Sequence, residues 1–322
     1  MDAARTLIFG ASGYIGSHVA EQAALAGQPA VCLLRPGSDD TFLATLAVTV
    51  IRVDLADDAA VLAQIQPGDR LINCIADSRL HVSEAQRHAT DVALACRLFH
   101  LAQQAGAAVF VQLGSIMAFG FGHHRQPLTE HSPCHGSYSY NRIALARETA
   151  LRALHRPDAT RLVLVRPATV LGRRDHACLP PLLAAHRFGL FPLVGNGRQP
   201  FSAIDARDAG RVLLQLAETA AEPVSLWLAQ GYCCDWLQLK AALDQACGRR
   251  SRVLQLPAMP LHLLAGLLEW ACPYAVNLPL TRFAVDVLGQ PLQLDDSRLR
   301  ASGFAPHYRL ADSITDFVAA DR

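Results

Sequence analysis

Short apolar runs alternate with longer helical stretches through the first half of the chain. The apolar runs cover Thr6–Gly10, Ala30–Arg35, Val48–Val53, Arg70–Ile75, Ala108–Leu113 and Leu162–Arg166. Between them lie Ala- and Leu-rich segments with helical spacing, at Tyr14–Ala26, Ala59–Gln64, Glu84–Ala105 and Tyr138–Leu154. This alternation predicts βαβ units, and right-handed crossovers then give an α/β fold with a doubly wound parallel sheet.

The alternation is lost after about residue 170, where prolines punctuate short helices. We therefore expect a first domain over residues 1–170 and a smaller lobe over residues 171–322, some segments of which return to the sheet. Ligands of open α/β sheets bind beyond the carboxyl ends of the strands, so this lobe would form the substrate pocket. The most apolar late stretch, Leu261–Ala275, is too short to cross a bilayer and predicts a lobe helix.

Composition narrows the classes of partner. The 322 residues are 51% apolar, and 29 Lys and Arg balance 28 Asp and Glu, so no global field attracts nucleic acid or anionic lipid. We expect a small-molecule substrate and neither nucleic acid nor a membrane as partner. The first ten residues lack the pattern of a secretory signal, which favours the cytoplasm. Nine scattered cysteines without a C-x-x-C pair predict reduced thiols.

A glycine-rich turn follows the first predicted strand and opens the first helix. Gly10 permits the turn, Gly13 lets the backbone approach a pyrophosphate, and Gly16 allows close packing of helix on strand. The loop residues between them also belong to the expected cofactor contacts; these are Ser12, Tyr14 and Ile15. Within a βαβ unit, this pattern predicts dinucleotide binding.

The end of the second strand bears on which dinucleotide is bound. An acidic residue there would hold the ribose 2′-hydroxyl of NAD, but the strand ends in Arg35, which favours the 2′-phosphate of NADP. NAD stays open, because Asp39 or Asp40 could fold back to the ribose. After the third strand, Asp54 and Leu55 are placed to meet the adenine; alternatively, Asp54 caps the next helix.

Further motifs follow in a fixed order, at Gly114–Gly120, Thr129–Pro133, Tyr138–Arg142, Arg166–Gly172 and Gly303–Pro306. Together with the glycine turn they resemble the extended short-chain dehydrogenase/reductase family over essentially the whole chain. That family includes NAD-dependent epimerases and dehydratases, and relatives that act on hydroxysteroids and dihydroflavonols. The resemblance implies a Rossmann sheet and a nicotinamide cofactor, with Ala76 and Pro167 among the residues around it.

The resemblance also assigns catalytic roles. Ser115 orients the reacting carbonyl or alcohol, and Tyr138 is the general acid/base, since hydride transfer leaves an oxygen whose proton must be exchanged. One helical turn beyond Tyr138 the family has a lysine that binds the nicotinamide ribose, and this chain has Arg142. Arginine keeps the positive charge, but its planar fork is directed differently from an ammonium. If Tyr140 were the catalytic tyrosine instead, the residue four positions later, where the family has lysine, would be Ala144.

Three functions stay open from the sequence. The first is an NADP-dependent reductase or dehydrogenase of a small, largely apolar carbonyl or alcohol, because the lobe is rich in large apolar residues, here Phe188, Leu190, Phe191, Leu193 and Phe201. The second is a nucleotide-sugar epimerase or dehydratase, with Arg198 or Arg207 on the diphosphate. The third is a non-catalytic dinucleotide-binding sensor or scaffold, motivated by the missing lysine.

Two secondary expectations concern assembly and metals. The long helices at Glu84–Ala105 and Tyr138–Leu154 resemble those through which the family forms homodimers, and their Ala- and Leu-rich faces are compatible with that contact. Four histidines precede Tyr138, at positions 123, 124, 131 and 135. Their spacing is that of a loop without a carboxylate partner, so we expect no metal site.

Overall fold

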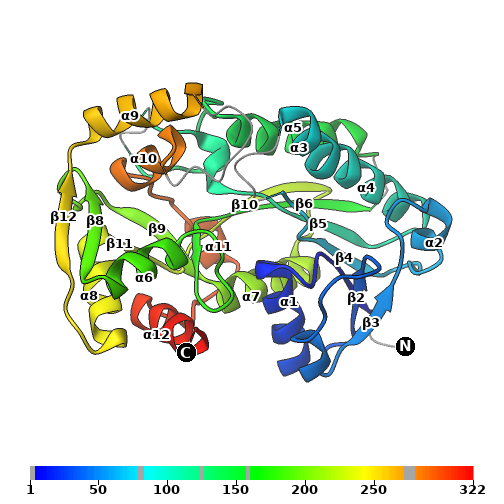
Figure 1. The fold of residues 1–322 in the computed structure, drawn as a ribbon. Coiled ribbons are helices and arrows are strands. Elements are labelled where there is room, and N and C mark those ends of the chain that lie inside the picture. Colours follow the sequence, from blue (N-terminus) through cyan, green and yellow to red (C-terminus); the bar gives the residue numbers. More distant parts are fainter. Residues whose placement is uncertain (1–3, 78–82, 123–125, 157–159, 272–279, 322) are drawn as a thin grey trace.

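Seven parallel strands form the central sheet, in the order β10-β6-β5-β4-β1-β2-β3 (Figure 1). Their bounds are β1 Thr6–Phe9, β2 Ala30–Leu34, β3 Thr49–Arg52, β4 Arg70–Asn73, β5 Val109–Leu113, β6 Arg161–Pro167 and β10 Val224–Ala229. The computed structural model describes residues 4–77, 83–122, 126–156, 160–271 and 280–321. The predicted doubly wound sheet is confirmed, and each of the six predicted strands agrees to within two residues at either end.

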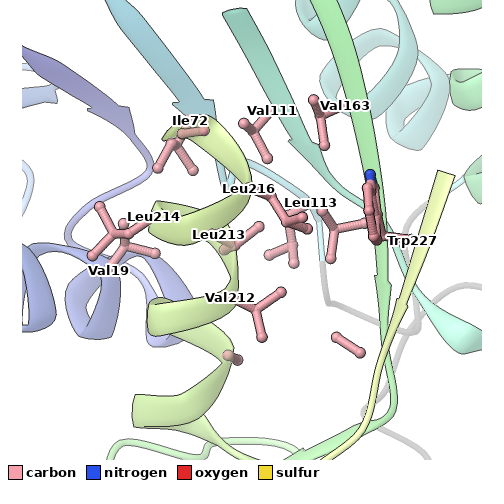
Figure 2. Close-up of a cluster of buried hydrophobic side chains, with 14 of the residues drawn as sticks. Val19, Ile72, Val111, Leu113, Val163, Val212, Leu213, Leu214, Leu216 and Trp227 are labelled. Atoms are coloured by element: carbon pink, nitrogen blue, oxygen red, sulfur yellow. The ribbon is translucent and has the colours of Figure 1, made fainter. Parts of the chain in front are cut away.

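Helices cover both faces of this sheet. α1 (Tyr14–Leu25) and α7 (Ala206–Thr219) pack on one face, while α2 (Asp58–Leu62), α4 (Leu94–Gln104) and α5 (Ser139–Leu154) belong to the other. Figure 2 shows α7 side chains such as Leu213 and Leu216 reaching the sheet beside Val111 and Leu113. Strands that are covered on both faces have continuous apolar sequences, and this is why they could be predicted from the sequence.

One helix differs from the sequence prediction. The helix expected over Glu84–Ala105 consists of α3 (Glu84–Arg87), a π-helical segment His88–Ala93 and α4. Inside the π-helical segment, the Asp91 carboxylate turns inward and accepts the backbone N–H of Asp77 at 2.7 Å. Beyond residue 171, β10 joins the sheet as its edge strand and α7 packs on it, and these are the segments that return to the sheet.

The remaining elements build the smaller lobe. A three-stranded sheet contains β7 (Thr169–Leu171), β9 (Phe201–Asp205) and β11 (Tyr232–Cys234), and a two-stranded parallel sheet pairs β8 (Leu190–Val194) with β12 (Arg252–Leu256). The lobe helices are α6 Leu179–Arg187, α8 Trp236–Cys247, α9 Ala258–Ala271, α10 Arg282–Gly289, α11 Ser297–Ala301 and α12 Leu310–Ala320. The predicted lobe helix therefore starts earlier, at Ala258, and residues 272–275 lie outside the described ranges. No described helix is both long and apolar enough to cross a membrane.

Candidate functional site

The glycine turn joins β1 to α1 at the sheet position where the strand order reverses. Gly10 has φ +76°, a conformation that side chains with a Cβ rarely adopt. A Cβ on Gly16 would lie 2.2 Å from the carbonyl oxygen of Gly10, so only glycine allows the helix to pack on the turn. Gly13 is exposed and caps α1 without a side-chain hydrogen bond. The first N–H groups of α1 therefore face an approachable surface, as a pyrophosphate site requires.

Arg174 reaches across to this turn from the loop after β7, and the sequence reasoning missed it. Its Nη2 donates to the carbonyl oxygen of Ser12 at 3.0 Å, and its guanidinium lies 4.8 Å from the ring centroid of Phe42. Burial lowers the pKa of Arg174, and its Nε has no hydrogen-bond partner within the described ranges. A cation beside the glycine turn suits an anionic diphosphate. The pair of adjacent arginines at positions 173 and 174 is the feature of the sequence that could have pointed to this cation.

The ends of β2 and β3 present the residues expected at the adenosine. Arg35 is exposed and forms no ion pair in the described part of the chain. Asp39 is used locally, because its carboxylate accepts hydrogen bonds from the backbone and hydroxyl of Thr41, and these lower its pKa. Asp54 is exposed and accepts the backbone N–H of Ala56 at 2.9 Å. The helix α2 is capped by Asp57, so the capping role considered for Asp54 was wrong.

Three other expected cofactor residues differ in exposure. Ala76 follows β4 and is exposed. Leu55 and Pro167 are buried, Leu55 within a core cluster and Pro167 as the last residue of β6. Of these three residues, only Ala76 is exposed.

The Ser115 and Tyr138 segments are tied together by Asn141, which the sequence reasoning also missed. Ser115 follows β5 and caps a 3₁₀ turn, its Oγ accepting the backbone N–H of Met117 at 3.1 Å. Tyr138 is the N-cap of α5. The buried Asn141 side chain donates to the carbonyl oxygen of Met117 and accepts the backbone N–H of Tyr138 at 3.0 Å. One amide therefore fixes both predicted catalytic segments.

The Tyr138 hydroxyl donates a hydrogen bond to Oδ2 of Asp286 in α10. Burial raises the pKa of Tyr138 well above its usual value, and the Asp286 carboxylate raises it further. The rings of Phe121 and Phe283 contact the tyrosine edge-on, with centroids 6.2 and 5.5 Å away. On the other side of Asp286, Gln290 donates to Oδ1 at 2.8 Å. The tyrosine thus lies between two aromatic rings, with its hydroxyl bound to the carboxylate of Asp286.

Arg142 faces away from this hydroxyl. It is exposed, and its Nη2 pairs with Oε2 of Glu84 at 2.7 Å. The hydrogen bond to Arg142 lowers the pKa of Glu84. Tyr138 and Arg142 are one turn apart, as the spacing predicted, but their side chains have different partners. The charged group that is hydrogen-bonded to Tyr138 is the carboxylate of Asp286, while Arg282 lowers the pKa of Tyr138 and Glu269 raises it by smaller amounts.

A buried ion pair supports the same edge of the sheet. Arg166, near the end of β6, donates to both carboxylate oxygens of Glu148 in α5, at 2.8 and 2.7 Å. Its guanidinium also stacks 4.4 Å from the ring centroid of Phe119, in the turn after Ser115. This bidentate pair fixes α5 against β6, and so fixes the helix that begins at Tyr138.

The five large apolar residues expected around the substrate are divided between the lobe core and the surface. Phe191, Leu193 and Phe201 belong to its buried core, whereas Phe188 and Leu190 are exposed. The expectation that the apolar lobe residues wall the substrate pocket was therefore wrong for the three buried residues, because they pack in the lobe core. Among the two arginines considered for a diphosphate, Arg207 is bound to Asp205 at 2.8 Å; Arg198 is exposed.

Neither the histidines before Tyr138 nor the described cavity provides a further metal or cofactor site among the described residues. His123 and His124 lie outside the described residues, and the described ranges contain no cluster of His, Cys, Asp and Glu that could hold a metal. A cavity of about 750 Å³ opens between β11, α8 and residues 306–311. None of its lining residues belongs to the predicted cofactor or catalytic set.

Comparison with known proteins places these features in a family. Residues 6–226 match the model of the NAD dependent epimerase/dehydratase family. A curated relative is the mitochondrial NADH dehydrogenase (ubiquinone) 1 alpha subcomplex subunit 9 of Arabidopsis thaliana. It is 25% identical over 218 residues, which cover 64% of this chain and 48% of the relative. The chain thus spans about half the length of that relative.

Solved structures share the fold over nearly the whole chain. The crystal structure of gox2253 has a TM-score of 0.81 at 21% identity, covering 99% of this chain and 98% of the other. UDP-glucuronic acid 4-epimerase from Bacillus cereus, in complex with UDP-glucuronic acid and NAD, has a TM-score of 0.76 at 17% identity, covering 98% of each chain. With the family match over most of its length, this chain belongs to the NAD dependent epimerase/dehydratase family.

Proposed function

We propose that the chain is an NAD(P)-dependent oxidoreductase that transfers a hydride to or from a small, largely apolar carbonyl or alcohol. The observation that carries this proposal is the tie made by Asn141, which holds the Ser115 turn and Tyr138 beside the carboxyl end of β5. The aromatic rings of Phe121 and Phe283 around Tyr138 support an apolar substrate. The unpaired Arg35 supports NADP over NAD.

The protonation state of Tyr138 supports the reductive direction. A bound nicotinamide supplies the hydride in such reactions. A tyrosine is protonated at neutral pH even at its usual pKa, and the raised pKa keeps Tyr138 protonated well above neutrality, so its hydroxyl has a proton to donate to the carbonyl oxygen. Ser115 donates a second hydrogen bond to the same oxygen. Arg142 contacts the nicotinamide ribose in this proposal, which requires it to leave Glu84 when the cofactor binds.

A second candidate is a non-catalytic dinucleotide-binding protein. It is favoured by the two contacts that separate Arg142 from Tyr138, namely Arg142 with Glu84 and Tyr138 with Asp286. A nucleotide-sugar epimerase is the third candidate, and a structural neighbour binds UDP-glucuronic acid and NAD. Arg207 forms an ion pair with Asp205, so Arg198 is the remaining candidate for binding the diphosphate.

For each of these functions we also propose a homodimer formed through α4 and α5.

Thermal unfolding with NAD, NADP and UDP-sugars separates these candidates, because a ligand that binds only the folded state raises the melting temperature. The oxidoreductase predicts a shift with NADP and none with UDP-sugars, together with net cofactor oxidation in a panel of carbonyl compounds. Copurified NAD without net turnover favours the epimerase. A shift with NADP and no turnover of any carbonyl favours the non-catalytic protein.

A further inference from the structure

The carboxylate of Asp286 lies between two side chains that can each carry a proton. Its Oδ2 accepts the hydroxyl of Tyr138, and Nε2 of His262 lies 3.8 Å from the same oxygen. His262 belongs to α9 and Asp286 to α10, and these two helices pack on each other in the lobe (Figure 1). One oxygen atom therefore stands between the predicted general acid and an imidazole.

These three side chains lead from the aromatic surroundings of the tyrosine to the solvent. The ring of Tyr138 is contacted edge-on by Phe121 and Phe283. The side chain of Asp286 is 15% exposed and that of His262 is 40% exposed. A proton from water therefore has ready access to the imidazole, which is the outermost of the three groups.

Neighbouring groups hold the carboxylate and leave its inner oxygen to these two partners. Gln290 donates to the other oxygen, Oδ1, at 2.8 Å. Two further charged groups near Tyr138 are Arg282 and Glu269, and they pair with each other at 2.7 Å. Histidine is the type of side chain that exchanges protons most readily near neutral pH. Beside Asp286, His262 is thus the group suited to supply a proton.

The proposed reduction consumes the proton of Tyr138. When the carbonyl carbon gains a hydride and the carbonyl oxygen takes the tyrosine's proton, the tyrosine is left as a phenolate beside a carboxylate. It must regain a proton before the next turnover. Arg142 cannot supply that proton, because it is paired with Glu84 and because an arginine does not release its proton in proteins.

We propose that Asp286 and His262 form a proton relay that returns a proton from water to Tyr138 after each reduction, an inference that rests on the proposed function. The imidazolium passes its Nε2 proton to the carboxylate of Asp286, which passes a proton to the phenolate oxygen. The phenol is restored, the imidazole is left neutral, and Asp286 is again a carboxylate. The imidazole then takes up a proton from water. For the transfer, the gap of 3.8 Å must close to about 2.8 Å, the length of a charge-assisted hydrogen bond.

The first test follows the hydroxyl proton of Tyr138 in the chain without cofactor or substrate. Proton NMR at neutral pH measures how fast this proton exchanges with water, and Tyr138→Phe identifies its resonance. His262→Ala should slow the exchange about tenfold, and added imidazole should restore it. His100→Ala is the matched control, since His100 is exposed in α4, outside the relay. Equal exchange in the wild type and His262→Ala, including exchange too fast to observe in both, overturns the proposal.

The second test is turnover of NADPH with a carbonyl compound that the wild type reduces. His262→Ala should turn over about tenfold to a hundredfold more slowly, with an unchanged KM for NADPH, and added imidazole should restore the rate. Asp286→Asn should also be slow, but imidazole should not rescue it, because the amide does not pass a proton on. Turnover that His262→Ala leaves unchanged, or a loss that imidazole does not restore, overturns the relay.

The two tests separate the relay from the proposed function. If the wild type reduces no carbonyl compound, the proposed function fails, and the exchange of the Tyr138 proton still decides whether the path through Asp286 and His262 exists. If the wild type reduces a carbonyl compound and His262→Ala does so equally well, the relay alone fails.

Discussion

The hydroxyl of Tyr138 donates a hydrogen bond to the carboxylate of Asp286, which lies 148 residues further along the chain. This contact joins the start of α5, beside the edge of the central sheet, to the lobe helix α10. The sequence has the cation Arg142 one turn along the helix, and a cation beside the tyrosine would lower its pKa. Burial and a carboxylate from the lobe raise it instead.

Replacing Asp286 by Asn should lower the pKa of Tyr138, because the phenolate no longer faces an anion. Wild-type Tyr138 stays protonated beyond pH 10, the usual value, so the stability from this site is complete below pH 10 and is lost as pH rises above it. The tyrosinate absorbance measured against pH, minus that of Tyr138→Phe, reports the change. Asp321→Asn is the control, and an identical titration in Asp286→Asn contradicts the assignment.

Gly13 and Gly16 should respond differently to alanine. A Cβ on Gly16 would clash with the backbone of Gly10, so Gly16→Ala should lose about 3 kcal/mol of stability. A Cβ on Gly13 lies 3.2 Å from the same oxygen and needs only a small adjustment. Gly13→Ala should therefore melt near the wild type, but without the shift that NADP gives the wild type. A retained shift in Gly13→Ala would remove the pyrophosphate from this turn.

Releasing Arg142 from Glu84 should strengthen cofactor binding if the arginine contacts the ribose. An exposed ion pair is worth up to about 1 kcal/mol, so Glu84→Gln should raise the affinity for NADP about two- to fivefold. Arg142→Ala should lower it. Calorimetric titration of both variants checks this, and equal affinities in both would exclude Arg142 from the cofactor site.

Arg35 should decide between the two dinucleotides. Its removal in Arg35→Ser deletes a charge-assisted hydrogen bond to the 2′-phosphate, so the affinity for NADP should fall about tenfold while that for NAD is unchanged. Arg52→Ser is a matched control, because Arg52 pairs with Asp40 at 2.7 Å. An equal loss for NAD and NADP, measured by calorimetry, would refute selection by Arg35.

Asp244 should stabilise the lobe in a pH-dependent way. Burial acts to raise its pKa, but hydrogen bonds outweigh burial and lower it to about 2; the donors are Lys240, Ser251 and His186. A lowered pKa contributes stability above the usual value of 3.8, and this is lost as pH falls toward 2. Because solvent screens this partly exposed group, Asp244→Asn should lower the free energy of unfolding by only about 1 kcal/mol at neutral pH, and should leave it unchanged near pH 2. Urea unfolding at both pH values tests this.

The sheet could be predicted because its strands are buried on both faces. Runs such as Leu7–Phe9 and Val109–Leu113 have no polar alternation and are bounded by glycine turns or helices. The π-helical segment at Asp91 could not be predicted, because no local pattern marks it and its Asp91 carboxylate bonds to the backbone of Asp77, 14 residues away. The return of some segments beyond residue 171 to the sheet was expected, but the sequence did not single out β10, because its partner, β6, is distant in sequence.

The candidate site was only partly visible in the sequence. Motif order located the glycine turn, Ser115 and Tyr138, since each has a local pattern. Asp286 and Arg174 lie in no such local pattern, because their hydrogen-bond partners Tyr138 and Ser12 are 148 and 162 residues away in the sequence. The direction of Arg142 likewise depends on Glu84, which another helix supplies.

The central claim is that Tyr138 protonates a substrate beside a bound nicotinamide. Its most direct test is the consumption of NADPH, followed by absorbance with a panel of apolar carbonyl compounds, in the wild type and Tyr138→Phe. We predict turnover by the wild type and a fall of about 10²- to 10⁴-fold in the variant, with NADPH binding retained. Turnover that Tyr138→Phe leaves unchanged, or NADPH binding without turnover of any carbonyl by either protein, would contradict it.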